Sequence, residues 1–288
     1  MEPRLVVAAK AELGEGPSWD EKLQVLRWVD IMKGEVHTFD PASGGDTAVV
    51  AGEFASSVVR RKKGGVALTL KHGFYSMDDK KVSLVAEVEA GSRVNRFNDG
   101  KCDPAGRFWA GTMNIEEKSP TGALYCLGKD GRVRKMVDGV TVSNGLGWSP
   151  ESDLMYYIDS PTRKVVAFDY DLDRGTIGKK RTVVDFGDQP GEPDGLTVDE
   201  EGMIWVAHWN GGRVTRFDAS DGKVIGVINL PVSLVTSCCF GGKDLDRLYI
   251  TTARNGLPAD QLQKEPLAGG VFEALPGLRG LPTYPYKG

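Results

Sequence analysis

Short strand-like segments recur along this chain about every 40–50 residues, and this repeat limits the possible folds more than any other feature. Runs rich in Val, Ile, Leu, Tyr and Trp come in pairs, for example GRFWAGT with GALYCLG, and GMIWVAHWN with GRVTRFD. Such runs, bounded by Gly, Asp and Asn, are typical of β-strands joined by turns. No segment keeps a helical period over three turns, so we expect at most one short helix, near Asp260–Lys264.

Six polar or small residues each precede one strand pair by a similar distance. They are Glu15, Ser57, Asn98, Asn144, Asp194 and Ser237. Subtraction of their numbers gives separations of 42, 41, 46, 50 and 43 residues. A repeat of this length with four strands per unit is typical of propeller blades. An irregular β-sandwich with accidental spacing is the alternative.

We therefore predict an all-β fold, a six-bladed β-propeller with four-stranded blades, formed by residues 1–288 as a single domain. The ring has to close, because an open sheet edge invites aggregation. The N-terminal segment PRLVVAA precedes the first repeat. We predict that it pairs with the last blade, near VFEALPG, and locks the ring.

Composition argues against several classes of function. No apolar stretch has the roughly 18 residues of a membrane span, and we see no signal peptide, so we expect a cytoplasmic protein. A net charge of −4 and only short basic clusters disfavour nucleic-acid binding. The spacing of Cys102, Cys126, Cys238 and Cys239 indicates buried, reduced thiols rather than a zinc site or disulfides.

Oxygen-bearing side chains occupy four of the six aligned positions: Glu15, Asn98, Asn144 and Asp194. The innermost strand of every blade lines the channel of a propeller, so these side chains should converge on the axis. Two carboxylates and two amides form a hard ligand set that suits Ca²⁺, Mg²⁺ or Mn²⁺ and lacks the His and Cys that Zn²⁺ prefers. Asn-Gly and Asp-Gly are also common turn signals. The apolar residues around them, as in VSNGLGW, favour buried strand instead.

The segments LGEGPSWD, NRFNDGKCDPAGRFWAGTM, VSNGLGWS, PDGLTVDEEG and TSCCFGGKD resemble the senescence-marker-protein/gluconolactonase (regucalcin-like) family. The resemblance runs from about Glu12 to the C-terminus. It implies a six-bladed propeller with one central divalent metal ion that hydrolyses aldonolactones such as gluconolactone. The strictosidine-synthase-like propellers are a poorer match, because NRFNDGK points away from them.

The resemblance also implies roles for individual residues. By motif, Glu15, Asn144 and Asp194 match the metal ligands, and Asp194 matches the general base. Arg96 and Asn98 match residues that contact substrate.

One further substrate contact is less well defined by the motifs. Glu116, three residues after GTM, falls where the family has a substrate-contacting glutamate. The segment NIEEKSPT is shorter than in animal relatives, so Glu117 is the alternative.

We therefore expect a metal-dependent lactonase that takes a small sugar lactone, as a monomer or weak homo-oligomer. Calcium is the first choice of cofactor, with manganese, magnesium or zinc as alternatives. The same metal centre could act on aryl esters or phosphotriesters, or the chain could be a calcium-binding propeller without turnover. An acid at the axis argues against a pure scaffold, which has no need for one.

Overall fold

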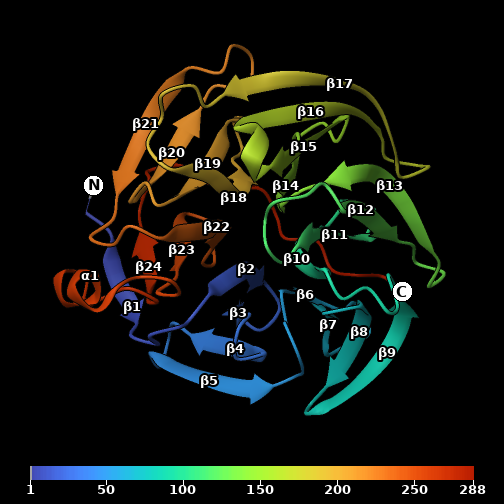
Figure 1. Cartoon of the computed structure of the whole chain (residues 1–288), viewed down its shortest axis with the longest axis horizontal. Coiled ribbons are helices and arrows are strands. Elements are labelled where there is room, and N and C mark those ends of the chain that lie inside the picture. The colour runs from blue at the N-terminus through green and yellow to red at the C-terminus, as the bar shows by residue number, and fades with distance from the viewer. Residues whose placement is uncertain (1) are drawn as a thin grey trace.

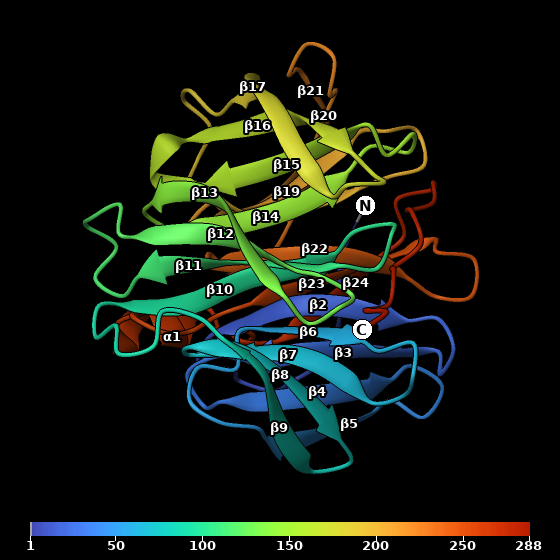
Figure 2. The same ribbon diagram turned by 90° about the vertical axis from the view of Figure 1, so that its right-hand side faces the viewer.

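The computed structural model describes residues 2–288, and these residues form six four-stranded antiparallel sheets around a central axis (Figure 1). This is the six-bladed β-propeller predicted from the repeat. Each sheet is one blade, with its first strand innermost in five of the six. In the side view, the strands near the axis run between the face that carries α1 and the face where the chain ends (Figure 2).

The first three blades follow one another along the chain. Their strands are β2 (Gly14–Asp20), β3 (Val25–Asp30), β4 (Glu35–Asp40) and β5 (Gly45–Val50); β6 (Ser57–Arg60), β7 (Val66–Leu70), β8 (Gly73–Asp78) and β9 (Lys81–Glu87); β10 (Asn95–Cys102), β11 (Phe108–Asn114), β12 (Gly122–Leu127) and β13 (Val133–Val140).

The next three blades complete the ring. Their strands are β14 (Ser143–Trp148), β15 (Leu154–Asp159), β16 (Lys164–Asp171) and β17 (Thr176–Asp185); β18 (Glu192–Val198), β19 (Ile204–Trp209), β20 (Arg213–Phe217) and β21 (Val224–Asn229); β22 (Val235–Gly241), β23 (Arg247–Thr252), β24 (Val271–Ala274) and β1 (Arg4–Val7).

The N-terminal strand closes the ring as predicted. β1 is the outer strand of the last blade and pairs antiparallel with β24, with Arg4 opposite Glu273. The same two residues form an ion pair of 2.6 Å between Nη2 and Oε2. The two ends of the chain therefore share one blade, and no extra strand is needed to complete it.

A repeated Asp–Trp contact explains why two of the blades are so similar in sequence. Nε1 of Trp109 donates a 2.9 Å hydrogen bond to Asp103, and Nε1 of Trp205 donates a 2.8 Å hydrogen bond to Asp199. In both blades the Asp precedes the Trp by six positions and also accepts a backbone N–H four residues on. The contact holds the β-turn between the first two strands and places the indole in the core.

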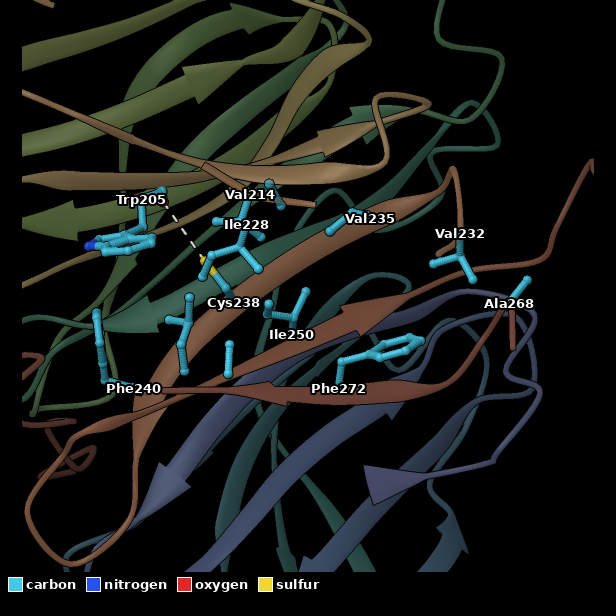
Figure 3. Packing of buried hydrophobic residues seen from close by; sticks show 13 residues of the cluster. Trp205, Val214, Ile228, Val232, Val235, Cys238, Phe240, Ile250, Ala268 and Phe272 are labelled. Atoms are coloured by element: carbon cyan, nitrogen blue, oxygen red, sulfur yellow. Dashed lines mark hydrogen bonds between the residues drawn. The ribbon is translucent and has the colours of Figure 1, made fainter. Parts of the chain in front are cut away.

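The hydrophobic core lies mainly between neighbouring blades rather than at the axis. Figure 3 shows one of these layers, in which Trp205 and Ile228 of the fifth blade face Phe240 and Phe272 of the sixth. Burial of these side chains fixes each blade against the next. The axis is left free for polar side chains.

The C-terminal tail after β24 crosses the face opposite α1. Its backbone hydrogen-bonds to Leu245 and Val198 on one side of the axis, and to Arg60 and Gly106 on the other. Leu281, Pro282, Thr283 and Tyr284 of this tail line a small cavity of about 60 Å³ at that end of the channel. The tail therefore covers one end of the channel.

Helical structure is scarce. A 3₁₀ turn, η1, covers Ser160–Thr162, and a single α-helix, α1, covers Ala259–Lys264, where the sequence predicted at most one short helix. Among residues 2–288, no helix is long and apolar enough to cross a membrane. All four cysteines are buried and unbridged, as expected.

Candidate metal centre and active site

The six aligned positions all lie in the innermost strands. They fall in β2, β6, β10, β14, β18 and β22, one per blade. Glu15, Asn98, Asn144 and Asp194 are each only 4–6% exposed, and Ser57 and Ser237 are likewise buried. The four oxygen-bearing side chains therefore approach the axis from four different blades.

Breaks in strand pairing accompany each of these four residues. The register of β2, β10, β14 and β18 against its neighbour shifts at or next to the oxygen-bearing residue. Bulges of this kind bend a strand and re-aim its side chains, and they recur beside active sites. Glycines allow the crowding: a Cβ on Gly195 would lie 2.0 Å from Oγ of Ser237.

A cavity of about 460 Å³ opens at the end of the channel away from the C-terminal tail. Glu15, Asn98, Asn144 and Asp194 all line it, and Arg96 lines it as well. The volume is within the range of sites that bind small molecules. The structure thus brings five of the six residues named from the sequence into one cavity.

A chain of hydrogen bonds links three of these side chains. Nη1 of Arg96 donates to Oδ1 of Asn98 at 2.8 Å, and Nδ2 of Asn98 donates to Oδ1 of Asn144 at 3.1 Å. Nδ2 of Asn144 donates to the hydroxyl of Ser160 at 2.9 Å. The Ser160 hydroxyl donates to the carbonyl of Pro193 at 2.6 Å, next to Asp194. Each amide is therefore held in one orientation.

The carboxylates at the axis are buried and close to one another. Burial, reinforced by the charge of Asp99, raises the pKa of Glu15 to about 8. Burial and the charges of Glu15 and Asp99 raise the pKa of Asp194 well above its usual range. Glu15 accepts a 2.7 Å bond from the N–H of Gly16, whereas Asp194 draws no stabilising hydrogen bond from residues 2–288. Without a further cation, the acids at this site disfavour one another's ionisation.

Arg96 supplies a positive charge on the cavity wall. Burial lowers the pKa of its guanidinium to about 10, so it stays protonated at neutral pH. Its Cζ lies 5.7 Å from the centre of the Phe54 ring, within reach of a cation–π contact. Phe54 also lines the cavity, and the sequence gave no reason to select it.

The two neighbouring glutamates differ in position. Glu116 lies outside the cavity, with its side chain 74% exposed and paired with Lys118 at 3.3 Å. Glu117 lines the cavity and acts electrostatically on Arg96 and Asp194. The structure therefore places the alternative, and not the first choice, beside the site. The reason is local: Glu117 adopts a left-handed turn with φ of 60°.

Asp99 and Lys101 were missed in the sequence. Asp99 is 4% exposed, and its Oδ2 atom has no hydrogen-bond partner among residues 2–288. Lys101 spans the channel and donates from Nζ to the carbonyl of Leu196 at 2.7 Å. Both line the smaller cavity below the predicted ligands. The consecutive polar residues of NRFNDGK were the available signal, since a bulge turns more than every second residue inward.

The side chains present fit a divalent cation. Carboxylate and amide oxygens are the ligands that hard cations prefer, and a cation would relieve the repulsion between Glu15 and Asp194. No group of three or more His, Cys, Asp and Glu residues suited to a metal occurs within residues 2–288. Amides supply half of the oxygen set here, so it does not depend on such a group.

The family model described as the SMP-30/Gluconolactonase/LRE-like region matches residues 13–254. The chain belongs to this family. The match includes all six aligned positions and the segments that carried the resemblance in the sequence.

Curated members of the SMP-30/gluconolactonase family align along nearly the whole chain. Regucalcin of Gallus gallus is 45% identical, over 96% of this chain and 95% of its own length. A Bacillus subtilis protein named for a proposed sugar lactone lactonase activity is 39% identical, over 100% of this chain and 99% of its own.

A solved structure of the same family has the same fold. It is described as a calcium-binding protein, regucalcin, from Agrobacterium tumefaciens. It has a TM-score of 0.94 and 29% identity, and covers 99% of this chain and 97% of its own.

Proposed function

We propose that this chain hydrolyses sugar lactones in the 460 Å³ cavity, with one divalent metal ion held by Glu15, Asn144 and Asp194. The observation that carries the proposal is the convergence of these oxygens beside a buried, charged Arg96. The family name and the Bacillus subtilis relative's name support lactone hydrolysis. The name of the Agrobacterium tumefaciens relative supports calcium as the first choice of ion, ahead of manganese, magnesium or zinc.

A bound divalent ion supplies Lewis-acid activation of the ester carbonyl and stabilises the negative charge that develops on its oxygen. Asp194 has a second task, because one of its carboxylate oxygens is free to accept the proton of the attacking water. Its raised pKa in the absence of a cation shows how readily this buried group holds a proton. A general base of this kind contributes about 10²–10⁴-fold to a rate.

Arg96, Asn98 and Glu117 bind the hydroxyl groups of the sugar ring. Arg96 retains donors, Asn98 is held rigidly by its bonds to Ser143 and Asn144, and Glu117 offers acceptors. Polar groups whose orientation is fixed before binding place the lactone carbonyl at the base of the cavity. The apolar cavity walls limit the access of further water.

The second candidate is the same centre acting on aryl esters, since aromatic residues Phe54 and Trp209 line the cavity. We also propose that the chain works in the cytoplasm as a monomer or weak homo-oligomer. Its four buried, unbridged cysteines support a reducing compartment.

A substrate panel tests the function. Purified chain is loaded with calcium, manganese, magnesium or zinc, and acid release is followed with aldonolactones, aryl esters and phosphotriesters at equal concentration. We expect the highest kcat/KM with an aldonolactone and loss of activity on chelation. Preference for aryl esters would support the second candidate, and binding of calcium without any turnover would show a non-enzymatic propeller.

A further inference from the structure

A belt of apolar side chains lies above the polar base of the cavity. Side chains two positions apart on a strand face the same side, so Leu13 lies above Glu15, and Val142 above Asn144. Met113 pairs with Arg96 across β10 and β11 and forms an isolated bridge with Val142. All three apolar residues line the cavity.

The belt continues to the mouth of the cavity, where apolar side chains remain open to solvent. Met32, in the turn after β3, is 47% exposed, and Ile115, just after β11, is 38% exposed. Both line the cavity, together with Phe54. Exposed apolar side chains gathered at a concave site are typical of contacts with a ligand. A ligand that carried only hydroxyl groups would leave this surface without a matching partner.

We propose that the preferred lactone carries an apolar substituent on the ring carbon that bears the hydroxymethyl group in a sugar lactone. This inference rests on the proposed function. With the carbonyl at Asp194 and the ring held by Arg96 and Asn98, the substituent extends toward the mouth between Met32 and Ile115. The cavity of 460 Å³ has more room than an unsubstituted six-membered lactone ring fills.

The size of the effect follows from apolar burial. Full burial of one methylene group is worth about fourfold in binding. Because Met32 and Ile115 leave one side open, we expect about half of that effect on a logarithmic scale, or about twofold per methylene. This binding is felt in kcat/KM, since the substituent makes the same contacts in the transition state.

The test is a series of δ-lactones with hydrogen, methyl, propyl or pentyl at that ring carbon. We expect kcat/KM of the metal-loaded chain to rise about tenfold or more from methyl to pentyl, at about twofold per methylene. A flat or falling series, measured with enzyme that hydrolyses the unsubstituted lactone, would overturn the inference and leave the proposed function standing. Absence of hydrolysis with every lactone, gluconolactone included, would overturn both.

Variants at the mouth locate the effect. Met32→Gln and Ile115→Gln replace apolar side chains by polar ones of similar length, and we expect the methyl-to-pentyl ratio to fall about threefold in each. Leu84→Gln is the matched control, because Leu84 is 55% exposed on the outer strand β9, away from the cavity. If all three variants kept the wild-type ratio, the substituent would bind elsewhere and the assignment to this rim would be wrong.

Discussion

The side-chain amide of Asn98 donates a 3.1 Å hydrogen bond to Oδ1 of Asn144 in the neighbouring blade. Asn144 donates in turn to the hydroxyl of Ser160, so its oxygen cannot exchange places with its nitrogen without the loss of both bonds. Asn98 therefore orients a proposed metal ligand from outside, in addition to its proposed contact with substrate. Such supporting contacts commonly affect metal affinity strongly.

We expect Asn98→Ala to weaken metal binding about 10–100-fold, the usual effect of removing a residue that orients a ligand. Titration calorimetry of the metal-free chain with calcium measures this directly. Asn95→Ala is the matched control, because Asn95 begins the same strand but bonds to Thr121 and Glu89. Equal calcium affinity of Asn98→Ala and the wild type would show that Asn144 needs no such support.

Asp194→Asn separates the two roles proposed for this residue. The amide keeps one oxygen for the metal but cannot accept a proton at neutral pH. At saturating metal, kcat should fall about 10²–10⁴-fold, the usual contribution of a general base. Asp194→Ala should lose metal binding as well. Near-normal turnover by Asp194→Asn would mean that another group activates the water.

The neighbouring glutamates provide a matched pair. Glu117 lines the cavity, so Glu117→Gln should raise KM for a hydroxylated lactone about tenfold, the value of a charged hydrogen bond of about 1.4 kcal/mol. Glu116→Gln removes a charge one position away from an exposed side chain and should leave KM unchanged. Steady-state kinetics on gluconolactone compare the two. The reverse order of effects would restore the first expectation from the sequence.

The fold could be predicted because its constraint repeats. Six in-phase units give six independent indications of the same blade, and the pairing of β1 with β24 follows from ring closure. The outer strands gave weaker signals. Strands such as β5 and β9 are largely exposed, so their sequences need not alternate between apolar and polar residues.

The site could be predicted only in part, for reasons of backbone geometry. Strict alternation along β10 brings Asn98 to the axis and turns Asp99 away, but the bulge between Phe97 and Gly100 leaves both buried near it. Glu117 faces the cavity through a left-handed turn, and Phe54 has a similar φ of 54°. Local conformations of this kind depend on the surrounding structure, and the residue types alone did not indicate them.

His208 should make stability depend on pH. Burial lowers its pKa to about 4, so the folded chain holds it neutral while the unfolded chain protonates it near pH 6.5. The unfolded state then binds more protons, and the free energy of unfolding should fall by up to about 3 kcal/mol as pH drops from 6.5 to 4. His208→Gln should remove this part of the slope. Urea unfolding at several pH values would reveal it, and identical slopes in both chains would rule it out.

The central claim is that one divalent ion at the propeller axis makes this chain a lactonase. Its most direct test is the initial rate of acid release from gluconolactone by metal-free chain, titrated with calcium. We predict no catalysis without metal, a rate that rises until one equivalent is bound, and a plateau beyond it. A rate that is independent of added and removed metal, or no catalysis at any loading with each of the four metals, would contradict the claim.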